Sequence, residues 1–446
     1  MKKTLFNRLT ALALVLVLVV AMAVPASAAY DMPITTSMED ESVYMVNLDD
    51  GTVLLDQNSS ETRYVASLTK MMTALLVLES GEDLEKTITV PESLTQEFKD
   101  IQNANGSDMR LIVGEEIRLI DLMYGLLVAS ANDAASVLAD YFGNGSIPAF
   151  VDQMNQKAAA LGCANTQFGC PHGLYDQGNV STAQDIVKIA TACWQNEKYM
   201  EIANTVKYTV PANNKHDQPR DLEATNLMLL PDGDYYREGI SGVKTGFTTL
   251  AGRCFVTTSS HEGHNYMLAI LGAKKEKKNE PFYIYPEVNS IFDWAFARYS
   301  DRTLLTKGEK VGEVALRGCD ESEVVTLHAN TDLVQHAYDD ASLTVDIEAP
   351  EEFKAPIKEG ESLGTAIVKL DGSEVGRVPL VADKKYESAL LKGSMRALLL
   401  VPAVLVVVVA LGYLTAQLSH SRVNFAVLFR KHRPQARGRR RTAVHK

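Results

Sequence analysis

The chain has 446 residues, of which 46% are hydrophobic, so its length favours about two globular units with additional segments. Its formal net charge is -12 at pH 7, and the acidic residues lie between basic ends, because residues 1–29 and 430–446 contain Lys and Arg but neither Asp nor Glu. Phosphate contacts are supplied largely by Lys and Arg, so this acidic body excludes nucleic acid as the expected partner.

The first of two long apolar segments lies at the N-terminus. Residues 11–24 are apolar, they follow the basic residues Lys2, Lys3 and Arg8, and they end in the small-residue stretch 25–29. A basic head, a short apolar body and a small-residue cleavage site are typical of a secretory signal, which we predict for residues 1–28. The alternative is an uncleaved anchor.

The second apolar segment lies near the C-terminus. Residues 397–418 contain no charged side chain and are long enough to cross a bilayer. The tail at 419–446 is strongly basic, and basic flanks stay on the cytoplasmic side. We therefore predict a single-pass protein of the cell membrane with its body outside the cell and a linker at 388–396. The alternative is a buried core helix.

The five cysteines all lie in the predicted extracellular part, and their odd number leaves at least one without an intramolecular partner. No CxxC or Cys/His metal spacing occurs, and His261 and His264 lack a third ligand at a recognisable spacing. We expect an exposed loop around the two histidines and no metal. Small buried thiols are favoured over a disulfide such as Cys163 to Cys170.

The chain after the signal begins with a predicted β-hairpin. The apolar runs 43–46 and 53–55 flank the turn residues Asp49-Asp50-Gly51. A helix follows from about Ser67, and residues 82–106 read as a mixed connecting region without a clear period.

Helical patterns dominate the middle of the chain. Residues 120–128 and 134–141 read as two helices separated by Ser130-Ala131-Asn132, since Ser and Asn favour breaks and caps. Two more helices are predicted at 149–161 and 182–194, the second with Ser181 as N-cap and Gln184 three residues later.

Strand patterns return later, at 254–258 and 266–271, and a helix at 291–298 closes the unit. Helices in the middle and strands at both ends predict an α+β domain over residues 30–300, in which the N-terminal hairpin joins the later strands. Residues 301–387 contain short runs broken by Gly, Asp and Pro, with a hairpin turn at Asp371-Gly372, which predicts a small all-β domain.

Ser67 and Lys70 stand three residues apart at the start of an apolar helical run. Residues i and i+3 are neighbours on a helix, so Lys70 can reach Ser67. A serine hydroxyl is a weak nucleophile until a base removes its proton, and an amine with a lowered pKa can do so near neutral pH. The spacing is common by itself and recurs at Ser241 and Lys244, so the context must decide.

Three short motifs supply that context, on a helix start, a helix break and a strand: Ser67-Leu68-Thr69-Lys70, Ser130-Ala131-Asn132 and Lys244-Thr245-Gly246. Each alone is readily explained as capping residues, a solvated lysine or a strand-end turn, but their joint occurrence in this order is much rarer.

With these motifs the chain resembles the penicillin-recognising serine enzymes, and among them the serine-type D-alanyl-D-alanine carboxypeptidases, or low-molecular-mass penicillin-binding proteins. The resemblance covers residues 42–383, less specifically in the β-rich part. Further blocks that support it are Phe168–Leu174, Ser181–Asp185, Lys244–Thr248 and Ala251-Gly252.

Two features depart from the family pattern. The family usually has Asn before the Pro-His-Gly-Leu turn, where this chain has Cys170, and many relatives end in an amphipathic helix where this chain has the apolar segment 397–418. Within the turn, His172 is expected to be a structural histidine and not part of a histidine-based triad.

The resemblance implies a β-lactamase/transpeptidase-like fold, with an antiparallel sheet and a helical cluster, and a role for each motif residue. Two neighbouring lysines would also lower each other's pKa. The implied roles are Ser67 as acylated nucleophile, Lys70 as general base, Ser130 as proton relay, Asn132, Lys244, Thr245, Gly246 and Phe247 in substrate binding, and the N–H groups of Ser67 and Phe247 as oxyanion hole.

The implied activity is removal of the terminal D-alanine from peptidoglycan stem peptides, in cell-wall biogenesis and cell shape, without a metal or organic cofactor. Penicillins and other β-lactams would acylate the same serine. A β-lactamase is the first alternative, although no Glu-x-x-Leu-Asn element stands between Ser130 and Lys244. The others are a DD-endopeptidase and a catalytically idle wall-binding scaffold.

Overall fold

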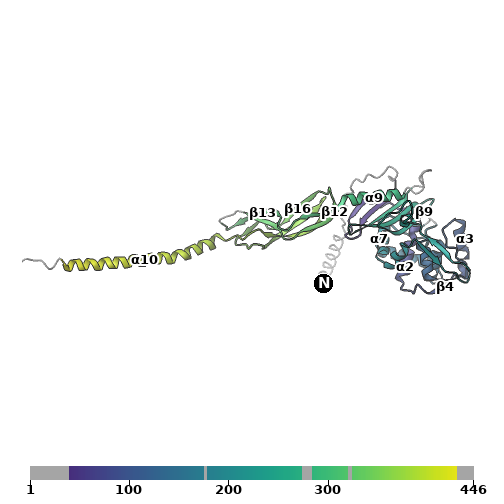
Figure 1. Ribbon diagram of the computed structural model, residues 1–446, viewed down its shortest axis with the longest axis horizontal. Helices are drawn as coiled ribbons and strands as arrows, with labels where there is room; N and C mark the ends of the chain where they lie inside the picture. The colour runs from purple at the N-terminus through teal and green to yellow at the C-terminus, as the bar shows by residue number, and fades with distance from the viewer. Residues whose placement is uncertain (1–39, 175–177, 274–283, 320–323, 429–446) are drawn as a thin grey trace, which may run out of the picture. The chain divides into compact units, whose positions relative to one another are not determined.

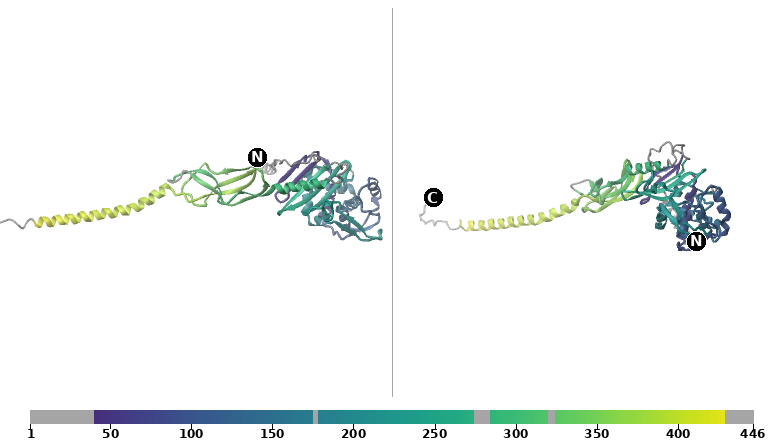
Figure 2. Two further views of the ribbon diagram at one scale, coloured as in Figure 1. Left: turned by 45° about the horizontal axis from the view of Figure 1, so that its top comes forward. Right: turned by 45° about the vertical axis from the view of Figure 1, so that its right-hand side comes forward.

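The computed structural model describes residues 40–174, 178–273, 284–319 and 324–428 (Figures 1 and 2). The predicted signal peptide at 1–28 and the tail from residue 429 on lie outside the described residues. The chain forms two compact units. The first ends at Ser300 and also includes Ala337–Asp340, and the second starts with Asp301–His336 and resumes at Ala341.

A five-stranded antiparallel sheet forms the frame of the first unit, in the order β2-β1-β11-β10-β9. The predicted N-terminal hairpin therefore joins the later strands, as expected for the α+β domain, and β9 is an edge strand. The strands are β1 (Ser42–Asn47), β2 (Val53–Gln57), β9 (Ile240–Thr248), β10 (Gly252–His261) and β11 (His264–Ala273).

Helices cover both faces of this sheet (Figures 1 and 2). Neighbouring residues of a strand point to opposite faces. Met267 of β11 contacts Thr191 of α7 (Ala183–Trp194), whereas Tyr266 packs against Phe296 of α9 (Ile284–Arg298). Helix α9 begins seven residues before the predicted start at 291, because buried residues from Ile284 onward extend its apolar side.

Helix α2 (Thr69–Glu79) lies at the centre of the helical cluster. Its residues from Thr69 to Leu75 are all buried, and a helix that is apolar around most of its circumference must be covered on every side. Its neighbours are α4 (Leu119–Leu127), α5 (Asn132–Phe142), α6 (Ile147–Ala160), α7 and α8 (Glu197–Ala203).

The connecting region at 82–106 is more regular than expected. It contains β4 (Thr87–Thr89), a short helix η2 (Glu92–Leu94) and α3 (Thr95–Asn103), and β4 pairs with β5 (Glu116–Arg118). Helix α3 buries only Phe98 and Ile101, too few apolar residues to produce a clear period in the sequence.

The predicted N-cap of α7 is wrong by one residue. Thr182, not Ser181, caps the helix, because its side chain accepts the N–H of Asp185 at 3.1 Å. Ser181 belongs to the short strand β6 (Val180–Ser181), which pairs with β3 (Arg63–Tyr64). The expected exposed loop around the two histidines is wrong, because His261 ends β10 and His264 begins β11, and both are half-buried. The His261 ring stacks on Phe296.

The second unit is all-β, as predicted, apart from the C-terminal helix. The order β16-β18-β19-β14-β13-β17 forms one six-stranded sheet, and β12 pairs with β15. Asp371 and Gly372, both with positive φ, connect β18 and β19 at the predicted hairpin turn. The strands are β12 (Tyr299–Leu305), β13 (Lys310–Arg317), β14 (Val324–Ala329), β15 (Leu333–Tyr338), β16 (Leu343–Glu348), β17 (Glu352–Lys354), β18 (Ser362–Leu370) and β19 (Ser373–Ala382).

A long helix, α10 (Ala389–Leu428), ends the described chain. Within it, Leu398–Leu418 has a mean hydropathy of 2.6, and it is long and apolar enough to cross a membrane. The expected linker at 388–396 is helical from Ala389 on, because its Ala, Leu and Lys residues favour a helix.

Candidate active site

Ser67 lies in a short helical turn, η1 (Ala66–Leu68), that leads directly into α2. The residue before it, Ala66, has φ +47°, in the left-handed region that a non-glycine residue rarely adopts. Such backbone strain persists where surrounding contacts impose it, and it clusters at functional sites. The structure therefore presents Ser67 at a sharp, constrained entry to a buried helix.

Lys70 is completely buried, and its Nζ makes three short contacts. It lies 2.8 Å from Ser67 Oγ, 2.7 Å from Asn132 Oδ1 and 2.7 Å from the backbone oxygen of His172. The Asn132 amide donates through Nδ2 to the Ser107 carbonyl at 2.9 Å, so its Oδ1 faces the lysine.

These partners determine what a neutral Lys70 can do. The Asn132 and His172 oxygens can only accept hydrogen bonds, so they take the two N–H groups of a neutral amine. The nitrogen lone pair is then left for Ser67, whose hydroxyl is the one partner that can donate. The geometry suits removal of the serine proton by the amine.

Two buried lysines shape the electrostatics. Burial, and next the charge of Lys244, lower the pKa of Lys70 well below its usual value. Burial lowers the pKa of Lys244 itself to about 7. The shift of Lys70 favours its neutral form near neutral pH, and the effect of the Lys244 charge on Lys70 has the direction that the sequence predicted. The shift of Lys244 has burial as its cause and does not itself make Lys70 neutral.

Ser130 lies in the break between α4 and α5, as predicted, whereas Asn132 is the first residue of α5, two residues before the predicted helix start at 134. Ser130 has φ +57° and is 6% exposed. The next residue, Asp133, was missed by the sequence analysis, although its carboxylate accepts the N–H groups of Met109 and Leu111. Burial raises the pKa of Asp133 to about 6, against the effect of those N–H groups. Asp133 thereby fixes the segment that faces Asn132.

Strand β9 forms the opposite wall with Lys244, Thr245 and Gly246. A Cβ at Gly246 would lie 3.0 Å from the Ser67 nitrogen, so a side chain there would crowd Ser67. Because β9 is an edge strand, one side of its backbone has no strand partner among the described residues of the sheet. Phe247, further along β9, is 42% exposed.

Thr225 is a second residue that the sequence analysis missed. Its hydroxyl lies 2.8 Å from the Thr245 hydroxyl, although the two residues are 20 positions apart. No spacing or periodicity in the sequence links them, so only the folded chain brings them together.

The Cys170–Leu174 turn packs on α2. Thr73 donates to the Pro171 oxygen at 2.6 Å, one helical turn beyond the contact between Lys70 and the His172 oxygen. Gly173 has φ +74°, and a Cβ there would lie 1.9 Å from the Ala66 oxygen, so only glycine fits. The His172 ring lies 3.1 Å from Glu97 and not on Ser67, so it forms no triad with the serine.

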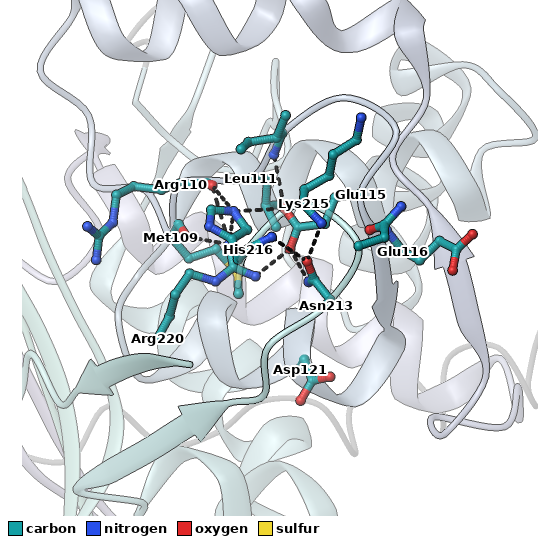
Figure 3. A network of polar contacts seen from close by, with 12 residues as sticks. Met109, Arg110, Leu111, Glu115, Glu116, Asp121, Asn213, Lys215, His216 and Arg220 are labelled. Carbon is teal, nitrogen blue, oxygen red and sulfur yellow. Dashed lines mark hydrogen bonds and ion pairs between the residues drawn. The ribbon is translucent and has the colours of Figure 1, made fainter. Parts of the chain in front are cut away.

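A buried ion pair supports the segment that faces Asn132 (Figure 3). Arg220 of β8 (Arg220–Glu223) pairs with Glu115 and donates to the Met109 oxygen at 2.9 Å. Asn213 donates to the same carboxylate at 2.7 Å, and the Ile112 N–H donates to it at 3.0 Å. The loop around residue 213 and the segment 107–115 are thus held together beside the site.

All five cysteines are free in the structure, which agrees with the expectation of unpaired thiols. Four are buried and Cys319 is partly exposed. Cys170 lies in the turn beside the site, with its sulfur among several N–H donors.

Two known protein families match most of the chain. The family described as D-alanyl-D-alanine carboxypeptidase matches residues 27–275, and the C-terminal domain of penicillin-binding protein 5 matches residues 299–388. The D-alanyl-D-alanine carboxypeptidase DacF of Bacillus subtilis is 29% identical over 388 residues, which cover 86% of this chain and 95% of the relative.

One further relative and one solved structure are similar to the chain, the latter in fold. A D-alanyl-D-alanine endopeptidase of Pseudomonas aeruginosa is 33% identical over 270 residues, which cover 60% of this chain and 83% of the relative. The crystal structure of penicillin-binding protein 5 from Haemophilus influenzae shares the fold, with a TM-score of 0.56 at 24% identity, over 80% of this chain and 100% of that chain. The chain belongs to the D-alanyl-D-alanine carboxypeptidase family of penicillin-binding serine peptidases.

Proposed function

We propose that this chain removes the terminal D-alanine from peptidoglycan stem peptides through an acyl-enzyme on Ser67. The observation that carries the proposal is the setting of Lys70, which contacts the Ser67 hydroxyl at 2.8 Å while its other two partners can only accept. A buried amine so arranged is a general base directed at one hydroxyl.

The reaction follows from this arrangement. Lys70 takes the Ser67 proton as Oγ bonds to the carbonyl carbon of the penultimate D-alanine, and the backbone N–H groups of Ser67 and Phe247 stabilise the oxyanion. Loss of one such donor typically costs about 3 kcal/mol in the transition state. Ser130 relays a proton to the leaving amine, D-alanine departs, and water then hydrolyses the ester.

The walls of the site suit an extended peptide. The free edge of β9 can pair with a peptide backbone, as in other complexes that add a strand to a sheet. Lys244 and Thr245 would hold the terminal carboxylate, with Gly246 leaving room beside the nucleophile, and Asn132 would hold the amide side of the substrate. This chemistry needs no metal or organic cofactor.

Carboxypeptidase activity is favoured over endopeptidase activity by one comparison. The match to the carboxypeptidase DacF extends over 86% of this chain, whereas the match to the P. aeruginosa endopeptidase covers 60%. A pentapeptide ending in D-Ala-D-Ala and a cross-linked stem-peptide dimer, each followed by mass spectrometry, separate the two activities. Faster cleavage of the dimer would reverse the preference.

The test of the nucleophile is the Ser67→Ala variant. It should lose both labelling by a fluorescent penicillin and release of D-alanine, and mass spectrometry of the wild-type adduct should locate the label on Ser67. The matched control is Ser241→Ala, in the other Ser-x-x-Lys spacing, where the hydroxyl donates to Asn204 at 2.9 Å. Retained labelling of Ser67→Ala would refute the proposal.

The same assays address the remaining alternatives. A β-lactamase would turn penicillin over rapidly and leave no lasting adduct. A scaffold without activity would bind peptidoglycan but release no D-alanine from a diacetyl-Lys-D-Ala-D-Ala peptide. A long-lived adduct together with D-alanine release supports the carboxypeptidase.

We further propose that the chain is anchored in the cell membrane through Leu398–Leu418, with both folded units outside the cell. A segment of 21 residues at about 1.5 Å per residue matches a bilayer core of roughly 30 Å. In this arrangement residues 30–300 form the catalytic domain, 301–387 the β-rich domain and 419–446 the cytoplasmic tail.

Protease accessibility tests the orientation. An epitope placed after Lys446 should resist protease added to intact cells and become sensitive after permeabilisation, and the protein should remain with membranes after an alkaline wash. Cleavage of the epitope in intact cells would reverse the orientation, and release by the alkaline wash would exclude a spanning helix.

A further inference from the structure

The Cys170–Leu174 turn supplies one of the three partners of Lys70, so its shape determines where the Lys70 nitrogen can point. The His172 oxygen can meet Nζ at 2.7 Å only while the two flanking peptide groups keep their orientation. The side chain of Cys170 holds one of these groups, because its sulfur accepts the Gly173 N–H at 3.2 Å.

The sulfur is itself held from a second direction. Asn179 donates through Nδ2 to Cys170 Sγ at 3.0 Å, and its Oδ1 accepts the Gly169 N–H at 3.2 Å. Cys170 is 8% exposed, so the N–H groups that point at its sulfur have little access to water. Without an acceptor at this position the Gly173 N–H would lose the sulfur as its partner, which is unfavourable for a buried donor.

The His172 ring holds the other side of the turn. Its Nδ1 accepts the Leu174 N–H at 3.0 Å, which places the ring proton on Nε2, 3.1 Å from Glu97 Oε1. Glu97 also accepts from Ser136 Oγ at 3.1 Å. A chain of contacts thus runs from α3 through the His172 ring to the backbone oxygen that meets Lys70.

We propose that Cys170 is a positioning residue for Lys70, whose sulfur, together with the His172–Glu97 pair, holds the turn that presents the His172 oxygen to the lysine nitrogen. The inference rests on the proposed role of Lys70 as general base. Cys170 does not form a bond in the reaction, so any side chain that offers a compact acceptor at the same place should serve.

The charges around Lys70 give this role a measurable signature. Lys244 faces it from β9, Asp133 from α5 and Cys170 from the turn, while Glu97 of α3 acts on the turn through His172. An electron-rich sulfur and a well-placed carbonyl both favour the charged lysine. Their loss should lower the pKa of Lys70 and, at the same time, misdirect its lone pair.

The experiment compares Cys170→Ala, which removes the acceptor, with Cys170→Ser, which keeps one. The matched control is Cys193→Ala, another buried thiol against α2, whose sulfur lies 3.6 Å from the Met71 oxygen. The full-length protein in detergent is acylated with a fluorescent penicillin from about pH 5 to about pH 10. Lysines whose pKa is lowered by burial titrate within this range.

We expect Cys170→Ala to slow acylation by about tenfold or more and to move the acid limb of the profile to lower pH. Cys170→Ser should remain within roughly threefold of the wild-type rate and move the limb less than Cys170→Ala does, and Cys193→Ala should leave both the rate and the limb unchanged. A merely structural defect would reduce the active fraction without moving the limb.

A wild-type rate and profile for Cys170→Ala would overturn the proposal, and so would a Cys170→Ser variant as slow as Cys170→Ala. If Cys170→Ala does not fold, Glu97→Gln serves instead, with a slower rate and the same direction of limb shift expected, and an unchanged profile again refuting the role. Mass spectrometry of the wild-type adduct separates the two claims. If the label is on Ser67 and Cys170→Ala has the wild-type rate and pH profile, only the positioning role is overturned. If Ser67 carries no label, the proposed function is overturned as well.

Discussion

The two units of the chain differ in how deeply their charged side chains are buried. In the first unit Lys70, Lys244, Glu115 and Arg220 are almost completely removed from water. In the second unit the ion pair between Arg377 and Glu348, on two different strands, has both side chains more than half exposed. The strands there are held instead by alternating buried apolar residues, for example Val325, Leu327 and Ala329 of β14.

The contrast shows that the first unit buries charged side chains at a cost in folding free energy. Taking a lysine or an ion pair out of water is unfavourable, and the surrounding hydrogen bonds offset that cost only in part. In the first unit the same burial lowers the pKa of Lys70, as the general base that we propose requires. Among the described residues of the second unit no Lys, Arg, Asp or Glu side chain is buried, and the buried His336 pairs with the exposed Asp301 at 3.1 Å.

The largest expected effect comes from Lys70→Met. Removing a general base typically slows a reaction by about 10²–10⁴-fold, so acylation by penicillin should fall by that factor. The melting temperature should stay the same or rise, because a buried amine is replaced by an apolar side chain of similar length. Stopped-flow labelling and calorimetry measure the two quantities. A variant that labels normally would remove Lys70 from the mechanism.

Breaking the buried pair should be the next largest effect. Glu115→Ala leaves the Arg220 charge buried and unpaired, so unfolding free energy should fall by about 3–5 kcal/mol. Both tryptophans, Trp194 and Trp294, lie in the first unit, so urea unfolding followed by fluorescence reports on that unit.

The control for this change removes both charges. The double variant Glu115→Leu with Arg220→Met should recover most of the lost stability, because no isolated charge remains. Equal losses for the single and the double variant would indicate that packing of the loop, and not the unpaired charge, causes the effect.

Lys244→Arg should change the pH dependence of kcat/KM. Lys70 must be neutral, so activity falls as the pH drops through its lowered pKa, and Lys244 must be charged, so activity falls as the pH rises through about 7. Arginine stays charged throughout this range. The alkaline limb should therefore move up by about two units or more, while the acid limb remains. An unchanged alkaline limb would assign it to another group.

The smallest effect is expected in the second unit. Arg377→Ala removes exposed contacts with Glu348 and Glu374, and such pairs contribute about 0–1 kcal/mol. Thermal unfolding followed by far-ultraviolet circular dichroism measures the change, and added salt should reduce it further. A loss of unfolding free energy as large as that of Glu115→Ala would contradict the proposed difference between the two units.

Much of the fold follows from local patterns. The hairpin, the break at Ser130 and the all-β second unit depend on turn residues and periodicities that lie within a few positions of each other. Helix α3 was not anticipated because its two buried apolar residues, Phe98 and Ile101, are too few to mark a face. The N-cap of α7 was misplaced because pairing of β6 with β3 takes up Ser181, and that pairing is a tertiary contact.

The active site also has one part that local sequence spacing predicts and one part that depends on tertiary contacts. The primary structure was sufficient to pair Ser67 with Lys70, since a helix brings residues three positions apart onto one face. It could not show which atoms complete the surroundings of Lys70, because Asn132 and His172 are 62 and 102 positions away. Burial and hydrogen-bond partners determine the charge of that lysine, and both exist only when distant segments pack around it. The spacing supplied a serine and an amine, and tertiary packing made the amine a base.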